Sequence, residues 1–370
     1  MDGGCEGRRH RSEIAAAAAR NGADASARGF AMIHAAIVGL GRWGRNLVTA
    51  SAGHPRLKIV GAVEPDIEAA QAFCAEHGLD LTEDLGAVLA APAIHAVLLA
   101  TPHLDHPAQV LACAAAGKQV FCEKPLALHA ADAARMFEAC RAAAVTLAVG
   151  HNRRFWPAMQ ALRGIVARGE LGTILHIEGH NSNENSHSIT AGWRLAPEQS
   201  PGGGLTGAGL HVLDAFVSLL GPVRQVFARL GSREAGPPPL DSAMMTLDFV
   251  NGVTGTLATV RATPLYWRVH VFGTGGSAEV LDEVTLIRRS SGRAAERTTY
   301  PAIDVLRAEI DAFADAIEQK CPFPVPEADV VATLQAFEAA VQSMSSGLPV
   351  ACDGRQGRPA GSGIRGKDLL

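Results

Sequence analysis

The sequence predicts a chain of the α/β class, in which a doubly wound parallel sheet is followed by an α+β domain with a largely antiparallel sheet. Three observations lead to this prediction. Short apolar runs alternate with helical stretches over residues 32–150, which is typical of buried parallel strands joined by helices. The pattern changes after Asn152. Several strands then follow with hairpin signals, such as the Asn-Gly pair at 251–252, and two helices end the fold.

In the first domain, each apolar run is expected to form a strand, and each longer amphipathic stretch a helix. Glycines mark two helix ends, because Gly78 and Gly117 can adopt the left-handed conformation that terminates a helix. The expected strands are 34–41, 57–65, 94–102, 118–125 and 145–152, and the expected helices are 45–53, 66–78, 106–117 and 130–143.

The second domain is expected to mix helices with hairpin-linked strands. The glycine-containing stretch 272–280 is interpreted as a hairpin turn, because no helix follows it as it would follow a phosphate loop. The expected elements are helices 156–168, 210–221, 303–319 and 327–345, strands 172–180, 225–231, 243–252, 253–262, 266–276 and 284–292, and a polar loop at 181–199.

Composition narrows the range of functions. A length of 370 residues allows two domains, and a formal net charge of −4 gives no reason to expect nucleic acid or an anionic membrane as a partner. No apolar run approaches the roughly 18–20 residues of a membrane span. The seven cysteines are scattered without a C-x-x-C pair, which argues against a disulfide framework and favours a reducing, cytoplasmic compartment.

The domain boundaries follow from these patterns. The two domains are expected at 32–150 and 151–350. Residues 1–31 are rich in Ala, Gly and Arg and are interpreted as a disordered extension or a start codon assigned too early, and 351–370 as a disordered tail.

The stretch IVGLGRWGRNL at 37–47 contains the pattern G-x-G-x-x-G between an expected strand and an expected helix. The first glycine of this pattern allows a tight turn, the second lets the backbone approach a pyrophosphate, and the third lets the helix pack closely. A glycine turn without a ligand is the alternative. The cofactor-site residues assigned on this basis are Gly39, Gly41, Arg42, Trp43 and Gly44.

The next strand ends in Glu64, whose carboxylate is placed to accept hydrogen bonds from the ribose hydroxyls of an adenosine. No arginine follows in the sequence VEPD to meet a 2′-phosphate, so the predicted cofactor is NAD in preference to NADP. Together with the glycine pattern, Glu64 makes the first domain a predicted Rossmann domain.

The stretch FCEKPL at 121–126 places Lys124 at the carboxyl end of a parallel strand, where open α/β sheets bind their ligands. Pro125 biases Lys124 away from helical angles and allows a cis peptide bond between the two residues. An ammonium group beside a nicotinamide can polarise a substrate oxygen or relay its proton. A surface Lys-Pro turn is the alternative.

These motifs together resemble those of the Gfo/Idh/MocA family of nicotinamide-dependent oxidoreductases, over roughly residues 32–350. The resemblance implies a Rossmann domain and an open-sheet C-terminal domain, through which members commonly form homodimers or homotetramers. It also implies activity on sugars, inositol and related polyols. The segments that carry it are GLGRWG, ATPHLDH, AAGKQVFCEKPLAL, GHNRRF, PGGGLTGAGLHVLD and PFPV.

The resemblance also assigns residues. It makes Lys124 and His211 the catalytic pair. The further cofactor contacts that follow from it are Thr101, Pro102, His106 and Glu123.

The glycine-rich stretch SPGGGLTGAGLHVLDAF at 200–216 leads into His211 at the start of a helix. A histidine is suited to act as a base near neutral pH. The residues alone favour a histidine that binds backbone or covers a domain seam, and it is the family resemblance that favours the catalytic role. Many dehydrogenases of the family carry an aspartate four residues before this histidine, where this chain has Gly207. Asp214, three residues after His211, shares its helix face and can orient the imidazole.

Polar and aromatic residues near the domain junction are expected to contact the substrate. Of Arg153 and Arg154, one is expected to reach substrate or cofactor and the other to form an ion pair. Trp193 and Arg194 offer an aromatic face and a donor fork for a polyhydroxylated ligand, with a packed indole beside a loop salt bridge as the alternative. The expected substrate-binding residues are Asn152, Arg153, Trp193, Arg194 and Asp214.

His176, Glu178 and His180 alternate along one expected strand and therefore share a face, and His187 follows them. No cysteine or carboxylate set at a known ligand spacing accompanies them, so no metal site is predicted. A strand that faces solvent or another subunit is the preferred interpretation.

The predicted function is an NAD-dependent dehydrogenase that oxidises a secondary alcohol of a sugar, inositol or related polyol held between the domains. His211 would take the hydroxyl proton while the hydride moves to NAD⁺, and Lys124 would stabilise the alkoxide. Two alternatives stay open. One is an NAD-dependent glycosidase of the same family, and the other is an NAD-binding sensor or regulator that has lost catalysis, which Gly207 suggests.

Overall fold

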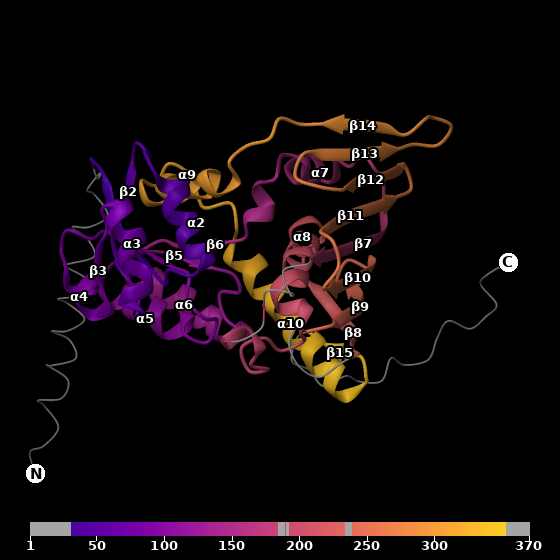
Figure 1. Cartoon of the computed structure of the whole chain (residues 1–370). Helices are drawn as coiled ribbons and strands as arrows, with labels where there is room; N and C mark the ends of the chain where they lie inside the picture. The colour runs from indigo at the N-terminus through magenta and orange to yellow at the C-terminus, as the bar shows by residue number, and fades with distance from the viewer. Residues whose placement is uncertain (1–30, 184–188, 190–191, 234–238, 353–370) are drawn as a thin grey trace, which may run out of the picture. The chain divides into compact units, whose positions relative to one another are not determined.

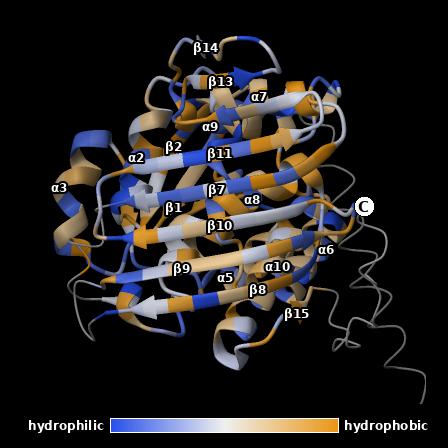
Figure 2. Cartoon of the chain, turned by 90° about the vertical axis from the view of Figure 1, so that its right-hand side faces the viewer, coloured by the Kyte–Doolittle hydropathy of each residue, from blue (hydrophilic) through white to orange (hydrophobic). Residues whose placement is uncertain are grey.

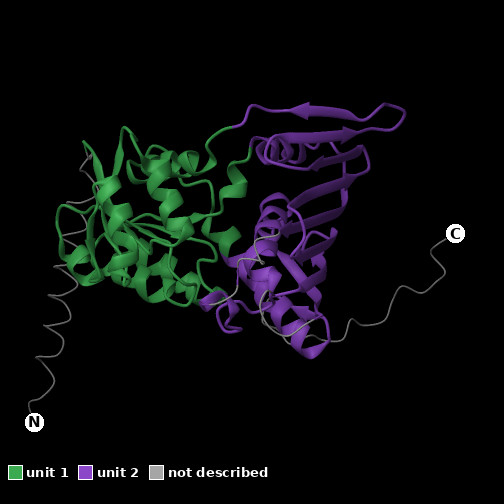
Figure 3. Ribbon diagram, in the orientation of Figure 1, with its two compact units in different colours: residues 1–156, 303–330 green, residues 157–302, 331–370 purple. Residues whose placement is uncertain are grey.

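The computed structural model describes residues 31–183, 189, 192–233 and 239–352 (Figure 1). The chain forms two compact units (Figure 3). Unit 1 comprises Met1–Trp156 and Ile303–Val330, and unit 2 comprises Pro157–Ala302 and Val331–Leu370. Of the extensions expected at 1–31 and 351–370, residues 1–30 and 353–370 lie outside the described residues. The expected tail begins too early, because Ala351 ends strand β15 and Cys352 is buried.

Unit 1 contains a six-stranded parallel sheet with the strand order β3-β2-β1-β4-β5-β6. This order reverses between β1 and β4, which makes their carboxyl ends the switch point where doubly wound sheets bind ligands. The predicted doubly wound fold is confirmed. Its strands are β1 (Ile33–Val38), β2 (Leu57–Val63), β3 (Asp80–Thr82), β4 (Ala96–Leu99), β5 (Gln119–Glu123) and β6 (Leu147–Gly150).

The helices expected at 66–78, 106–117 and 130–143 are present, whereas the helix expected at 45–53 begins three residues earlier, at Arg42, and α4 was not expected. The Asp66 side chain caps α3 by accepting the Ala69 N–H at 3.0 Å, and Gly78 ends α3 at a φ of 64°. The helices are α2 (Arg42–Ser51), α3 (Ile67–His77), α4 (Leu85–Ala90), α5 (His106–Ala115), α6 (Ala130–Ala142), the short 3₁₀ helix η1 (Asn152–Phe155) and α9 (Val305–Ile317).

Helix α9 groups with unit 1, whereas the sequence analysis assigned it to the second domain. Its Phe313 is fully buried, with its ring centroid 5.8 Å from that of Phe121 on β5. Near the same end of the helix, Arg56 pairs with Asp315 at 2.5 Å and with Glu318 at 3.2 Å. The periodicity of a helix shows which of its faces is apolar, but it does not show which distant sheet that face covers.

Unit 2 contains a nine-stranded sheet with the order β14-β13-β12-β11-β7-β10-β9-β8-β15. Neighbouring strands pair antiparallel, apart from β7 and β10, which run parallel. The prediction of a largely antiparallel sheet is confirmed. The strands are β7 (Ile174–Asn183), β8 (Val223–Ser232), β9 (Asp241–Phe249), β10 (Thr254–Arg261), β11 (Tyr266–Gly273), β12 (Gly276–Val280), β13 (Thr285–Arg289), β14 (Glu296–Thr299) and β15 (Val350–Ala351).

Two turn predictions in this sheet are confirmed. Strands β9 and β10 pair antiparallel around the Asn-Gly sequence at 251–252. Strands β11 and β12 pair antiparallel across residues 272–280, so this glycine-containing stretch is a hairpin. The helices of unit 2 are α7 (Pro157–Ala167) and α8 (Leu210–Leu220), and α10 (Glu327–Ser346) runs along the chain from unit 1 into unit 2.

One face of this sheet, here called the inner face, packs against α8. A Cβ atom at Gly179 on β7 would collide with the side chains of Val212 and Phe216, so the strand has glycine where the helix lies closest. Figure 2 shows the opposite, outer face of β8–β11, with α8 and α10 behind the strands. None of the described helices is both long enough and apolar enough to cross a membrane.

Candidate active site

The turn between β1 and α2 is built from closely packed glycines. Gly39 has a φ of +88°, and a Cβ atom there would lie 2.8 Å from the carbonyl oxygen of Ala100. A Cβ atom at Gly44 would collide with the carbonyl oxygen of Gly39, so α2 packs directly on the turn. This is the geometry expected for the first and third glycines of a dinucleotide-binding motif.

The start of α2 has the features of an anion site. A Cβ atom at Gly41 would meet no atom within 4 Å, so this glycine borders open space. The helix begins at Arg42 without a side-chain cap and without an acidic residue in its first turn. The positive end of its dipole is therefore offset neither by a cap nor by an acid within that turn. Arg42 is exposed, and its guanidinium lies 5.6 Å from the ring centroid of Trp43. These residues fit the pyrophosphate of a dinucleotide.

The carboxylate of Glu64 lies directly beside the glycine turn. One of its oxygens accepts the N–H of Leu40 at 2.7 Å, and the other accepts the N–H of Asp66 at 3.3 Å. Sequence reasoning missed a second support of this turn, Arg45, which donates to the carbonyl oxygens of Leu40 and Ala69, each at 2.9 Å. The sequence did contain a signal for this role, because Arg45 is a long, positively charged side chain in the first turn of the helix that follows the glycine motif. Glu64 is held where a ribose hydroxyl next to the pyrophosphate could reach it.

His106 connects the loops that follow β4 and β5. It is fully buried, with Nδ1 at 2.8 Å from the carbonyl oxygen of Pro125 and Nε2 at 3.1 Å from that of Thr101. Burial lowers the pKa of His106, and the carbonyl contacts only partly oppose this effect. The sequence analysis expected His106 to contact the cofactor together with Thr101 and Pro102, which are half-buried. Because His106 has no exposed surface, its geometry is that of a support for those residues.

Lys124 follows β5 directly and is half-buried, and its peptide bond to Pro125 is cis. The preceding Glu123 is buried, and its carboxylate accepts the backbone N–H of Lys124. Burial raises the pKa of Glu123 to about 7, although the charge of Lys124 opposes the shift. The side chain of Glu123 thus holds the turn that carries Lys124.

Glu309 on α9 is a second buried acid, which sequence reasoning missed. It has no exposed surface, and neither carboxyl oxygen has a hydrogen-bond partner in the described part of the chain. Phe313, one turn further along α9, packs on Phe121, which precedes Glu123 by two residues on β5. This register directs Glu309 toward Glu123. Burial, and then the charge of Glu123, raise the pKa of Glu309 well above its usual range.

The segment η1 separates the roles of its two arginines. Arg154 forms an ion pair with Asp329 at 2.6 Å and is almost fully buried, so it is the structural arginine. Arg153 lies with its guanidinium 4.0 Å from the ring centroid of Trp156. The side-chain oxygen of Asn152 is buried and has no hydrogen-bond partner among the described residues, so it can accept a hydrogen bond from a ligand.

In unit 2, His211 lies in the first turn of α8, and both His211 and Asp214 are buried. A single π-helical turn, η4 (Leu205–Gly209), precedes this helix. Gly207 in that turn is exposed, and a Cβ atom there would meet no atom within 4 Å. Among the expected substrate contacts, Arg194 lies with its guanidinium 4.2 Å from the ring centroid of Trp193.

The three alternating side chains of β7 each bind a neighbour on the sheet. His176 lies 2.8 Å from the hydroxyl of Thr254, Glu178 accepts a hydrogen bond from Arg268 at 2.6 Å, and His180 bonds to Ser182. His187 lies outside the described residues. Within the described ranges, no group of three or more His, Cys, Asp or Glu side chains is arranged to hold a metal ion.

Two family models match the chain. The oxidoreductase family with an NAD-binding Rossmann fold matches residues 33–151, and the GFO/IDH/MocA C-terminal domain matches residues 159–279. The chain belongs to the Gfo/Idh/MocA oxidoreductase family. It is therefore an oxidoreductase with an NAD-binding Rossmann domain, as the motifs around Gly39 and Lys124 predicted.

Among curated proteins of this family, the chain is 30% identical to the 2,7-anhydro-N-acetylneuraminate hydratase of Escherichia coli K12, over 67% of this chain and 68% of that protein. It is 27% identical to the scyllo-inositol 2-dehydrogenase (NAD(+)) of Bacillus subtilis, over 87% and 96% of the two chains. These two relatives carry different activities on one family fold.

Solved structures of the family share the fold. A putative NADPH-dependent oxidoreductase from Desulfitobacterium hafniense superposes with a TM-score of 0.79 at 25% identity, covering 88% of this chain and 99% of that one. Levoglucosan dehydrogenase in complex with NADH and levoglucosan gives a TM-score of 0.78 at 22% identity, covering 86% and 99%. At 22% identity, the similarity to levoglucosan dehydrogenase shows a shared fold and nothing further.

Proposed function

We propose that this protein is an NAD-dependent dehydrogenase that oxidises a secondary alcohol of a sugar, inositol or related polyol. The observation that carries the proposal is Lys124, which follows β5 at the carboxyl edge of an NAD-binding sheet. The activity of the scyllo-inositol 2-dehydrogenase relative supports the substrate class. NAD is preferred to NADP because the Glu64 carboxylate beside the glycine turn would repel a 2′-phosphate.

In this proposal NAD⁺, when bound, accepts the hydride that leaves the carbinol carbon. The imidazole of His211 takes the hydroxyl proton, so that the C–O single bond becomes a carbonyl. The ammonium of Lys124 stabilises the negative charge that develops on the oxygen. Asn152 offers its side-chain oxygen to a donor of the ligand, and Glu64 accepts from the adenosine ribose.

The test is a pair of variants, Lys124→Ala and His211→Ala, assayed for NADH formation against a panel of polyols. Each should lower kcat/KM by about 10²–10⁴-fold while leaving NAD binding measurable. Lys58→Ala, an exposed lysine on β2, and His176→Gln, on the outer face of the sheet, are the matched controls and should stay near wild type. Near-normal turnover in both active-site variants would contradict the mechanism.

A second candidate is favoured by the hydratase relative. In a glycosidase or hydratase of this kind, the cofactor would remove a hydride early and return it later, so that water adds without net NADH. Product analysis separates the two functions, because a polyol dehydrogenase accumulates NADH and a ketone. Tight NADH binding without turnover of any sugar would instead support a sensor or regulator.

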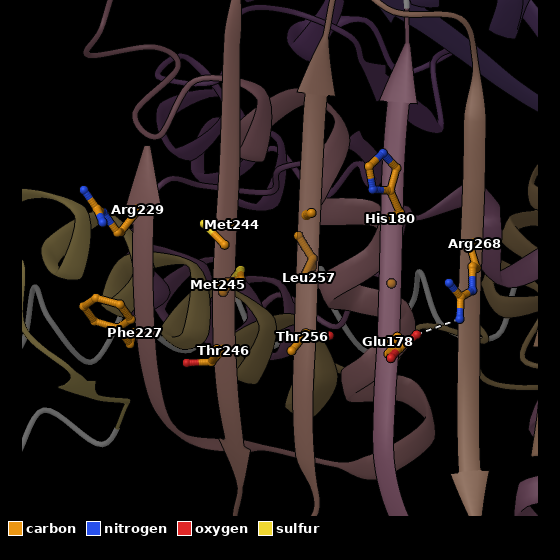
Figure 4. A pocket seen from close by; sticks show the side chains of 12 residues that line it. Glu178, His180, Phe227, Arg229, Met244, Met245, Thr246, Thr256, Leu257 and Arg268 are labelled. Atoms are coloured by element: carbon orange, nitrogen blue, oxygen red, sulfur yellow. Dashed lines mark hydrogen bonds and ion pairs between the residues drawn. The ribbon is translucent and has the colours of Figure 1, made fainter. Parts of the chain in front are cut away.

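We propose further that the chain forms a homodimer or homotetramer through the outer face of the nine-stranded sheet. A hollow of about 460 Å³ lies on this face. Figure 4 shows Met244, Phe227 and the Glu178–Arg268 pair among the side chains that line it. Met244 is 61% exposed. An apolar group rimmed by charges on an uncovered sheet face is typical of an association surface. A cytoplasmic location stays a prediction.

A further inference from the structure

The glycine-rich segment before His211 lies tightly against one end of the inner face of the sheet. A Cβ atom at Gly203 would lie 2.6 Å from a carboxylate oxygen of Asp241, and one at Gly204 would lie 3.0 Å from the hydroxyl of Thr259. At Gly209 the distance to the Thr259 methyl group would be 2.7 Å. These glycines are therefore required for close contact with the sheet.

Two polar side chains of the sheet bind the backbone of this segment. The carboxylate of Asp241 on β9 accepts the N–H of Gly204 at 3.2 Å. The amide of Asn181 on β7 donates to the carbonyl oxygen of Ala208 at 2.9 Å. Gly204 directly precedes the π-helical turn η4 and Ala208 is its last residue but one, so the turn is fixed to the sheet at its start and near its end.

Asp241 is itself held by a largely buried ion pair. The Nε of Arg261 on β10 donates to one carboxylate oxygen at 2.8 Å, and a terminal nitrogen donates to the other. The side chains of Asp241 and Arg261 are 7% and 14% exposed. Other side chains of the inner face, such as Leu247, Leu257 and Val269, are apolar and buried.

A buried ion pair is weak evidence for stability, because desolvation of the two charges offsets much of their attraction. A role in orientation accounts better for the pair. The backbone groups near a π-helical turn lack the usual helical partners, and such turns occur frequently at functional sites. Holding Gly204 fixes where the turn begins, and this determines the direction in which the first turn of α8 presents His211.

We propose that Asp241 and Arg261 are positioning residues, which hold the glycine segment on the sheet and thereby orient His211. The proposal rests on the proposed function in that it takes His211 as the proton acceptor. Neither residue contacts the reacting atoms in this proposal. Each acts through the backbone of residues 203–209.

Two double variants separate orientation from stability. Asp241→Leu with Arg261→Met replaces the pair by apolar side chains, a change that often preserves stability, but it leaves Gly204 without its acceptor. Asp241→Asn with Arg261→Gln removes both charges but keeps an acceptor oxygen for Gly204. We expect kcat to fall about 100-fold in the apolar variant and to stay within about tenfold of wild type in the amide variant.

One of the measurements, the titration of His211, would not change if Asp241 and Arg261 contributed only to stability. In spectra of carbon-13-labelled histidine, the titration of His211 should shift in the apolar variant and match wild type in the amide variant. NADH affinity should be unchanged in both, because the residues that fit the dinucleotide belong to unit 1. Asp248→Asn, on the same strand β9 as Asp241, is the matched control, because it breaks an exposed ion pair with Arg224 on β8.

A wild-type kcat and an unshifted His211 titration in the apolar variant would overturn the proposal. If that variant does not fold, Asn181→Ala carries the test, because it removes the anchor at Ala208 and should shift the same titration. The titration needs no substrate. A shifted His211 in a protein that oxidises no polyol would therefore leave the positioning role standing while the proposed function fails.

Discussion

Gly207 stands where the family resemblance led us to expect an aspartate, four residues before His211. The position is exposed, and a Cβ atom there would meet no atom within 4 Å, so an aspartate fits without displacing a neighbour. We expect Gly207→Asp to fold normally and to raise kcat by about tenfold, because a carboxylate four residues before His211 stabilises the imidazolium that forms on proton transfer. The pKa of His211 should rise, and with it the acidic limb of the pH profile of kcat.

The matched control at this position is Gly207→Asn, which has almost the same shape and no charge. It should leave the acidic limb where it is in the wild type. A limb that stays in place in the aspartate variant too would show that the carboxylate does not reach His211. The sensor interpretation would gain support if Gly207→Asp created turnover in a protein that otherwise has none.

Strand β5 and helix α9 bring two carboxyl groups together in the core of unit 1. Burial raises the pKa of Glu123 from 4.5 to about 7, and burial together with the charge of Glu123 raises that of Glu309 further above 4.5. Both groups bind a proton more tightly in the folded chain than in the unfolded chain. Their contribution to stability is therefore complete below pH 4.5 and declines as the pH rises toward and through the folded pKa values.

Glu309→Gln should remove one of these two titrations. Between about pH 5 and pH 7, the free energy of unfolding of the variant should fall less steeply than that of wild type, by about 1.4 kcal/mol per pH unit. Urea unfolding at several pH values measures this slope. Glu138→Gln, an exposed acid on α6, should leave the slope unchanged. Equal slopes for Glu309→Gln and wild type would show that Glu309 ionises normally.

The features that sequence reasoning predicted are those whose physical cause is local. The tight turn at Gly39, the helix end at Gly78 and the Asn-Gly hairpin depend on the backbone of a few consecutive residues, so their sequence carries the signal. The features that it missed depend on distant partners. Asp241 binds Gly204 across 37 positions of the chain, and Glu309 looked like one acid on an amphipathic helix until α9 was seen to cover β5.

The hydrophobic pattern of the sequence also could not predict short elements or how deeply a given side chain is buried. Strand β3 and helix α4 contain 3 and 6 residues, too few for a periodic signal. His106 was expected to touch the cofactor, and the structure buries it between two loops instead. A motif shows which residue belongs to a site. The packing around that residue decides whether its side chain contacts the ligand or supports a neighbour that does.

At the scale of the whole molecule, the outer face of the nine-stranded sheet, which no described helix covers, predicts self-association. Burying Met244 and the exposed Tyr266 against a second copy would remove apolar surface from water, which favours association by about 25 cal/mol per Å². We expect Met244→Glu to shift the protein to monomers at micromolar concentration, because a carboxylate at this position would be desolvated in the interface. Light scattering coupled to gel filtration measures the mass. Leu348→Glu, an exposed apolar residue outside the sheet, should leave the mass unchanged, whereas a monomeric wild type, or a Met244→Glu variant with the wild-type mass, would contradict association through this face.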